Sequence, residues 1–368
     1  MADKTKIEWT DASWNPIRGC SRVSEGCRNC YAEAVAYRFS GKGQPYEGLA
    51  VLKNDHPSWT GKVEFVEDHL LDPLHWKKPR RIFVNSMSDL FHEQVQDVWI
   101  DRIFAVMALA PQHTFQVLTK RPGRMLTYLA SEETAQRLMA AFAAMAAVTP
   151  GVEFTIRHKL DGLTGICFPN VWLGVSVENQ DAANERIPLL LKTPAAIRFI
   201  SAEPLLGKVD LQQIKYRDDD VDCLWNALTA YHEVLNSNSM DIVATADDGV
   251  TKLDWVICGG ESGPHARPMH PDWARSLRDQ CQVSGVPFFF KQWGEWSPES
   301  PEHYRKMSEH SFSHETFSWA RDGSVYNPKD PPLDHFPSTM VYRVGKRTAG
   351  HILDGKIYQE FPKEKVIA

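Results

Sequence analysis

The chain has 368 residues, of which 43% are hydrophobic and 24% charged, and its formal net charge is -6. This length can bury a sizeable core, and it favours one large α/β domain with insertions, or two domains. No apolar run is long enough to span a bilayer, and the first residues lack the apolar core of a signal peptide. We therefore expect a cytoplasmic protein without a membrane partner, and the mildly acidic balance leaves room only for a local nucleic-acid-binding patch.

Seven short runs that are rich in β-branched and aromatic residues divide the chain. Each run is almost unbroken in hydrophobicity, which is typical of strands buried on both faces of a parallel sheet. The first run lies within 9–17, and the others are 81–85, 114–118, 171–175, 197–200, 255–258 and 287–290.

Segments with apolar residues at helical spacing lie between several of these runs, at 95–110, 133–148, 180–191 and 272–283. Alternation of strands and helices predicts βαβ units and a parallel sheet. Seven such strands favour a partial or full (β/α) barrel, although an open sheet remains an alternative. We expect the barrel to span 1–293, with insertions near 131–164 and 212–253. The polar, Pro-rich remainder at 294–368 predicts an irregular C-terminal extension that packs on the barrel.

Small, polar or charged residues follow each predicted strand. Because the carboxyl ends of parallel strands meet at one edge, we expect these residues to form a single mouth, where barrels carry their active sites. The residues that we select as binding candidates at these strand ends are Ser86, Asp89, Lys120, Ser176, Glu178, Glu203, Gly259, Gly260 and Glu261.

Roles for these residues follow from their chemistry. Ser86 and Asp89 could hold an amino group, and Lys120 could pair with a carboxylate. Ser176 and Glu178 could exchange hydrogen bonds with a ribose. The glycines at 259 and 260 would let a flat base lie against the backbone.

Three cysteines, Cys20, Cys27 and Cys30, lie where the first predicted strand gives way to a predicted helix. Three thiolates leave one position of a metal open, whereas structural zinc and ordinary iron–sulfur clusters use four protein ligands. Cys27 and Cys30 would share one helix face if the helix begins near Gly26. We expect the remaining cysteines to be small, buried, hydrophobic residues of the core: Cys167, Cys223, Cys258 and Cys281.

The sequence resembles the phage-associated three-Cys-motif proteins over nearly its whole length. The similarity rests on the opening residues 6–11 and 14–16, on the cysteine motif at 19–33, on the strand-end motifs at 118–122, 172–179, 201–205 and 259–263, and on the tail at 344–355. More distantly, the strand ends are similar to those of radical S-adenosylmethionine enzymes, especially the spore photoproduct lyase branch. The C-x6-C-x2-C spacing differs from the C-x3-C-x2-C spacing that is common in those enzymes.

This resemblance implies a barrel of the radical S-adenosylmethionine type with a [4Fe-4S] cluster on the three cysteines. S-adenosylmethionine would bind the fourth iron, and its reductive cleavage would give a 5′-deoxyadenosyl radical. A nucleotide or nucleic-acid base in a phage or prophage context is the implied substrate. The implied partners are an electron donor and a three-Cys-motif partner protein.

Other interpretations of the cysteines remain open. The chain could be a zinc-binding module with a histidine or Cys258 as fourth ligand, or an interaction protein in which a cluster acts only as a staple. Trp293 and Trp296 could stack a nucleobase or could simply pack against the barrel. The basic residues Lys77, Lys78, Arg80 and Arg81 precede the second strand, so we expect them on the face opposite the mouth.

Overall fold

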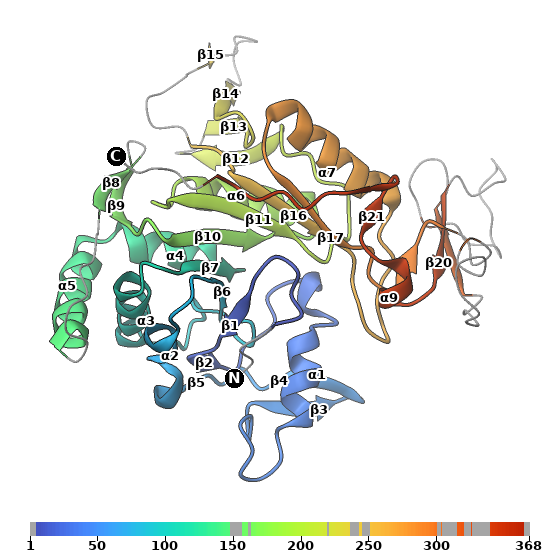
Figure 1. Cartoon of the computed structure of the whole chain (residues 1–368). Coiled ribbons are helices and arrows are strands. Elements are labelled where there is room, and N and C mark those ends of the chain that lie inside the picture. Colours follow the sequence, from blue (N-terminus) through green and yellow to red (C-terminus); the bar gives the residue numbers. More distant parts are fainter. Residues whose placement is uncertain are drawn as a thin grey trace.

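A parallel sheet of seven strands is the centre of the fold (Figure 1). The computed structural model describes residues 5–147, 157–160, 163–218, 221–235, 243–244, 251–299, 303, 315–319, 325 and 339–363. Within these residues the sheet has the order β1-β6-β7-β10-β11-β16-β17, so its strands are adjacent in the order in which the chain reaches them. The strands are β1 (Ala12–Trp14), β6 (Arg81–Val84), β7 (Thr114–Thr119), β10 (Val171–Ser176), β11 (Ile197–Ala202), β16 (Trp255–Gly259) and β17 (Phe288–Gln292).

All seven predicted strands are therefore confirmed, and each pairs in parallel with its neighbours. The sheet remains open between β1 and β17, which makes it a partial β/α barrel. The predicted helices are also present, as α3 (Asp97–Leu109), α5 (Glu132–Ala147), α6 (Gln180–Leu191) and α7 (Pro271–Ser284). Crossover connections between parallel strands are almost always right-handed, so successive strands are added on the same side of the sheet.

The helices cover one face of the sheet. Alternate strand residues such as Val84, Val117 and Leu173 share the main hydrophobic core with residues of α3, α6 and α7 and of α4 (Pro122–Ala130). Side chains on a strand alternate between its two faces, so the intervening residues lie on the opposite, concave face.

Large aromatic side chains fill the concave face toward the amino ends of the strands. Trp255 lies at the centre of this second core, with ring centroids 5.8 Å from Trp172 and 5.7 Å from Phe199. Gly174 makes room for them, because a Cβ atom at this position would lie 2.5 Å from the ring of Phe199. This end of the partial barrel is therefore a packed core.

The C-terminal segment covers the same end. It runs beside the edge strand β17, where the Phe290 amide donates to the Tyr358 carbonyl over 2.8 Å. The Phe361 ring then lies 5.2 Å from that of Trp255, and the guanidinium carbon of Arg81 is 4.0 Å from the Phe361 ring centroid. Phe361 of the C-terminal segment and Arg81 of β6 thus close the amino end of the concave face.

The insertions and the extension form smaller units. The first insertion contains α5, as predicted, followed by the hairpin of β8 (Arg157–Leu160) and β9 (Leu163–Cys167). The second contains a four-stranded antiparallel sheet of β12 (Ile214–Asp218), β13 (Val221–Asn226), β14 (Tyr231–Leu235) and β15 (Val243–Ala244). The division at residue 293 remains a prediction.

The described part of the extension is more regular than we expected. β18 (Trp296–Ser297), β19 (Thr316–Trp319) and β20 (Thr339–Arg343) pair in an antiparallel sheet, and β21 (Ile352–Leu353) forms a hairpin with β22 (Lys356–Ile357) after α9 (Lys346–Ala349). β18, β19 and β20 are short and far apart in the sequence, so local patterns do not predict their pairing, whereas only two residues separate β21 from β22.

The remaining elements lie between β1 and β6. They are β2 (Ile17–Arg18), the 3-10 turn η1 (Glu25–Cys27), α1 (Tyr31–Arg38), β3 (Ala50–Lys53), β4 (His56–Trp59), β5 (Glu64–Phe65), the 3-10 turn η2 (Glu67–His69) and α2 (Asp72–His75). Among the described residues, no helix combines the length and the hydropathy that crossing a bilayer requires.

Candidate functional site

Polar side chains replace the aromatic ones on the concave face at the carboxyl ends of the strands. Ser176 pairs in register with Ser201, two residues beyond the apolar pair of Gly174 and Phe199. The same alternation places Lys120 after β7 and Glu203 after β11 on this face. The structure therefore brings the predicted strand-end residues to one edge of the sheet, as the parallel topology requires.

Residues 20–30, which we call the cysteine segment, lie across this polar edge. Gly19 forms a parallel bridge with Ser88 beyond the end of β6, so the chain enters the segment at the carboxyl side of the sheet. The predicted helix start near Gly26 is wrong, because a 3-10 turn covers Glu25–Cys27 and α1 begins only at Tyr31. Gly26 and Asn29 lie against residues that follow the strands, so the segment is held at the mouth.

Glu178, which follows β10, makes the first of these contacts with the cysteine segment. Its carboxylate accepts hydrogen bonds from the Ser24 hydroxyl at 2.9 Å, from Lys120 Nζ at 2.5 Å and from Arg186 at 2.9 Å. Gly26 lies directly against it, since a Cβ atom there would be 2.4 Å from the Glu178 carboxylate. Burial raises the pKa of Glu178, but the charges of Lys120 and Arg186 outweigh that effect and lower it. Glu178 is therefore an ionised group that fixes the cysteine segment over β10.

Glu261 makes the equivalent contact beyond β16. It accepts a hydrogen bond from the Asn29 side chain at 2.9 Å and pairs with the Arg267 guanidinium at 2.7 Å. Arg267 also donates to the carbonyl of Glu25 in the cysteine segment. Burial raises the pKa of Glu261, and hydrogen bonds from Arg267 and Asn29 lower it by more.

Asp89 and Arg121 form the third contact, beyond β6 and β7. Asp89 is buried and accepts hydrogen bonds from the Thr119 hydroxyl at 2.7 Å, the Lys120 amide at 3.0 Å and Arg121 at 3.1 Å. Arg121 in turn donates to the hydroxyl of Ser21, which follows Cys20. Asp89 thus orients the Lys120 turn and, through Arg121, the start of the cysteine segment.

Glu203 lies on the other side of the mouth. Its carboxylate is 2.6 Å from Lys291 Nζ and accepts a longer hydrogen bond, of 3.4 Å, from the Gln292 amide. Gln292 is buried, and its side-chain oxygen has no hydrogen-bond partner among the described residues. The Ser86 hydroxyl contacts Asn15 Oδ1 at 3.2 Å, so Ser86 belongs to the β1 and β6 side of the mouth.

The two predicted glycines have different surroundings. A Cβ atom at Gly260 would lie 1.9 Å from the Trp293 carbonyl oxygen, so this glycine permits two backbone segments to approach each other. At Gly259 a Cβ atom would meet the side chains of Glu203 and Lys291 at an ordinary 3.5 Å. Only Gly259 therefore borders the polar group on the concave face, and base binding at either position stays a prediction.

The three motif cysteines are partly exposed, whereas the other four are buried as expected. Burial raises the pKa of Cys20 to about 12 and that of Cys30 to about 11, and the charges of Cys30 and Cys27, respectively, add to these two shifts. In the described part of the chain, however, no three His, Cys, Asp or Glu side chains converge closely enough to hold a metal ion. A metal would have to draw the thiols together and displace their protons.

Cys258 does not suit the role of a fourth zinc ligand. It lies in the main core on the helix-covered face, where it is fully buried together with Cys281 of α7. His92 is a nearer imidazole, because its Nε2 atom is 2.9 Å from the Ser21 hydroxyl. The three cysteine thiolates suit an iron–sulfur cluster and zinc equally well, since iron and zinc both bind thiolate sulfur.

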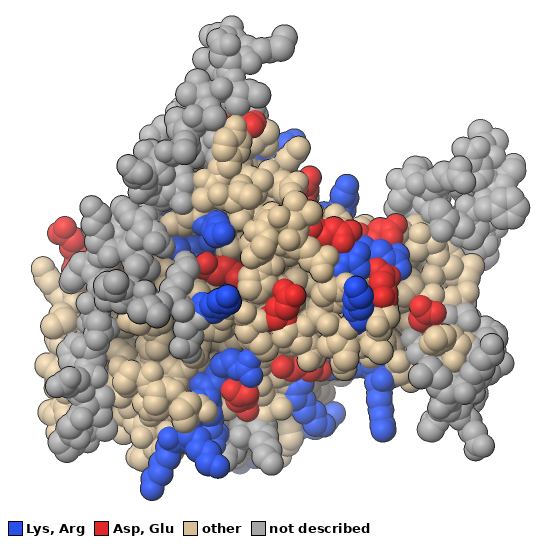
Figure 2. Space-filling view, turned by 45° about the horizontal axis from the view of Figure 1, so that its top comes forward, with Lys and Arg blue, Asp and Glu red and all other residues tan. Residues whose placement is uncertain are grey.

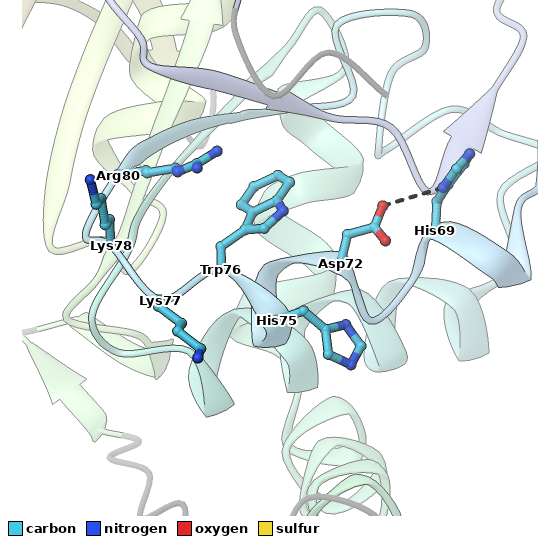
Figure 3. Close-up of a pocket in the computed structure, with 7 residues that line it drawn as sticks. All are labelled: His69, Asp72, His75, Trp76, Lys77, Lys78 and Arg80. Atoms are coloured by element: carbon cyan, nitrogen blue, oxygen red, sulfur yellow. Dashed lines mark ion pairs between the residues drawn. The ribbon is translucent and has the colours of Figure 1, made fainter.

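The two tryptophans considered for nucleobase stacking pack inside the protein. Trp293 and Trp296 are buried, and their indole nitrogens donate to the carbonyls of Ile352 and Ala266 at 2.8 Å. The packing interpretation therefore holds for both. The four basic residues lie at the amino end of β6, as expected: Arg81 is its first residue, and Lys77, Lys78 and Arg80 precede it and line a separate pocket (Figure 3).

Several residues of the site escaped the sequence reasoning. Arg186, Arg267 and Lys291 each pair with a selected carboxylate, but each lies on a separate loop, helix or strand end. Arg186 follows Glu178 by eight residues, a separation that is not diagnostic of a contact. The available signal was that the chain has nearly as many basic as acidic residues. Figure 2 shows Lys and Arg beside Asp and Glu on the face of the molecule that it draws.

The fold and these contacts define an α/β protein with a partial β/α barrel whose polar mouth is crossed by a cysteine-bearing segment. The chain belongs to the family described as "Protein of unknown function (DUF5131)", whose model matches residues 4–362. Searches among curated proteins and among solved structures found no match to this chain.

Proposed function

We propose that this protein is an iron–sulfur enzyme that binds S-adenosylmethionine and performs radical chemistry on a nucleotide or a nucleic-acid base. The observation that carries the proposal is the attachment of the cysteine segment to the polar mouth through Glu178, Glu261 and Arg121. Active sites of β/α barrels lie at this end of the strands. A three-thiol segment at such a mouth supports a cofactor site better than a remote structural staple.

The residues that would hold a [4Fe-4S] cluster are Cys20, Cys27 and Cys30. Three thiolates leave one iron for the cofactor. When bound, the cluster would supply the electron that cleaves a carbon–sulfur bond of S-adenosylmethionine, and an external electron donor would have to reduce it.

Lys120 is the cation that we assign to the carboxylate of S-adenosylmethionine. Its side chain is on the concave side and is partly exposed, and its present partner Glu178 keeps Arg186 and Ser24 when Lys120 turns to a ligand. Arg121 is a poorer choice, because Asp89 and Glu93 already hold its guanidinium. Ser176 lies on the same face as Lys120 and could bond to a ribose hydroxyl.

Glu178 takes a different role from the one that its position in the sequence indicates. A buried carboxylate with three donors has little capacity left for a ribose, and its contact with Gly26 ties it to the cysteine segment. We therefore assign Glu178 a positioning role. The substrate, the phage context and a three-Cys-motif partner protein rest on the resemblance of the sequence motifs.

Anaerobic reconstitution tests the proposal. The protein is loaded with iron and sulfide, reduced with dithionite and mixed with S-adenosylmethionine, and 5′-deoxyadenosine is measured. We expect 5′-deoxyadenosine from the native protein and none from the Cys27→Ala variant. A native protein that binds a [4Fe-4S] cluster but does not cleave S-adenosylmethionine would refute the radical enzyme, and a colourless protein that binds only zinc would favour the zinc module.

A further inference from the structure

A surface pocket of about 480 Å³ lies at the amino ends of the strands, away from the mouth. It is formed by α2 and by the loop that leads into β6, as Figure 3 shows. Its volume is in the range of about 300–1,000 Å³ that is usual for ligand sites. Its lining residues are His69, Asp72, His75, Trp76, Lys77, Lys78 and Arg80.

The lining of this pocket is basic although the chain as a whole is acidic. Three cations stand against one acid, which gives the lining a formal charge of +2 with neutral histidines, whereas the chain carries -6. The acid, Asp72, lies 3.2 Å from His69 Nδ1, so it already has a partner within the pocket. A concave surface of one sign raises the local concentration of ligands of the opposite sign.

Trp76 gives the pocket a fixed aromatic wall. The Arg80 guanidinium carbon is 5.0 Å from the ring centroid, and the His113 ring packs edge-on at 6.1 Å. Figure 3 shows Trp76 in the middle of the pocket, with Arg80 and Lys78 to one side and the Asp72–His69 pair to the other. A cation stacked on an aromatic ring loses little freedom when it binds an anion.

We propose that this pocket binds the phosphates of a single-stranded nucleic acid. Basic and aromatic residues together are the usual components of such sites. Lys77 and Lys78 are exposed and point in different directions in Figure 3, so their charges are spread across the pocket and do not converge on one point. Spread charges suit successive phosphates of a chain better than a single phosphate group.

The site does not depend on the proposed radical chemistry, because it lies at the opposite end of the strands from the cysteine segment. It can be tested on protein without iron. The probe is a fluorescein-labelled oligothymidylate of about twelve nucleotides, which is within the site sizes of single-strand binders. Fluorescence anisotropy gives its affinity at several salt concentrations.

The test compares two double variants that remove the same charge. Lys77→Ala/Lys78→Ala changes the pocket, and Lys53→Ala/Lys356→Ala changes two exposed lysines outside the pocket lining. We expect the pocket variant to bind about tenfold or more weakly, and the slope of log affinity against log salt to fall by about 1.4 for two lost phosphate contacts. The control variant should bind nearly as the native protein does.

Two results would overturn the proposal. Equal weakening in both double variants would mean that the oligonucleotide responds only to net charge. Competition by inorganic phosphate or thymidine 5′-monophosphate as effective, per molecule, as competition by unlabelled oligothymidylate would mean that the pocket recognises a small phosphate and not a chain. Circular dichroism on both variants establishes that each is folded before the affinities are compared.

Discussion

The two ends of the concave face are built by the same strands, yet their chemistry is opposite. At the amino ends, Trp172, Phe199 and Trp255 pack into a core that Phe361 covers. At the carboxyl ends, Lys120 and Glu203 stand on the same face among charged partners. A strand of five or six residues thus contributes to stability at one end and presents polar groups for a site at the other.

We expect the largest effect on the stability of the protein from a substitution at the aromatic end. Trp255→Ala should lower the free energy of unfolding by about 3–5 kcal/mol, because it removes a buried ring that five other aromatic side chains contact and leaves a cavity. Denaturant unfolding measures this change. Val283→Ala, at a side chain that is 84% exposed, is the control and should change stability little. A loss below about 1 kcal/mol at Trp255 would contradict the assignment of this end as a core.

At the polar end we expect the main effect on binding. Lys120→Ala should weaken binding of S-adenosylmethionine to the iron-loaded protein about ten- to a hundredfold, as loss of a charge-assisted contact does. Calorimetry measures the affinity, and the visible spectrum reports whether the cluster is retained. Lys120→Arg keeps the charge and should recover part of the affinity. Unchanged affinity in Lys120→Ala would mean that the cofactor carboxylate binds elsewhere.

A smaller, local effect should follow from crowding the cysteine segment. In Gly26→Ala the new methyl group would overlap the Glu178 carboxylate, and such overpacking costs about 1–3 kcal/mol. We expect reduced iron retention with the sheet intact by circular dichroism. Gly123→Ala is the matched control, because nothing lies within 4 Å of its Cβ position. Full iron retention in the Gly26 variant would show that Glu178 does not position the segment.

Buried histidines and buried carboxylates should contribute to stability in different pH ranges. Burial lowers the pKa of His113, near the amino end of β7, below its ordinary value of 6.5. The unfolded chain therefore takes up the proton first, so this contribution to stability is complete above about pH 6.5 and is lost as the pH falls below it. The carboxylates of Glu178 and Glu261 have lowered pKa values, so their contribution is lost only below about pH 4.5.

Thermal unfolding at about pH 7.5 and about pH 5.5 isolates the histidine contribution, because the carboxylates stay ionised at both pH values. We expect a lower melting temperature at the acidic pH, and a smaller difference between the two pH values in His113→Gln. An unchanged difference in that variant would assign the effect to other groups, such as His92 and His270, whose pKa values burial also lowers.

The sequence predicts the sheet well and the contacts of the site poorly. Unbroken apolar runs identify all seven strands, because strands covered on both faces leave no polar positions. Parallel topology then places Lys120, Ser176 and Glu203 at one edge without further information. Periodicity carries no signal, however, for the closing of the amino end by Phe361, which lies 106 residues beyond Trp255.

The cysteine segment illustrates the same limit. Its motif predicts a metal site, but its path depends on Glu178 and Glu261, which are more than 150 residues away in the sequence. The predicted helix start at Gly26 failed because the backbone there forms a 3-10 turn, in which the amides of Cys27 and Arg28 donate to the carbonyls of Ser24 and Glu25, while the side chains of Ser24 and Asn29 donate to the distant carboxylates. Local propensity gives way wherever a loop is held by distant charged groups.

Iron content after anaerobic reconstitution tests the central claim, that the cysteine segment forms a metal centre at the polar mouth. We expect Cys20→Ala, Cys27→Ala and Cys30→Ala each to lose bound iron and visible absorption, while Cys281→Ala, at a cysteine buried beneath the sheet, keeps both. Full iron in the Cys27→Ala protein, or equal loss in the Cys281→Ala protein, would contradict it.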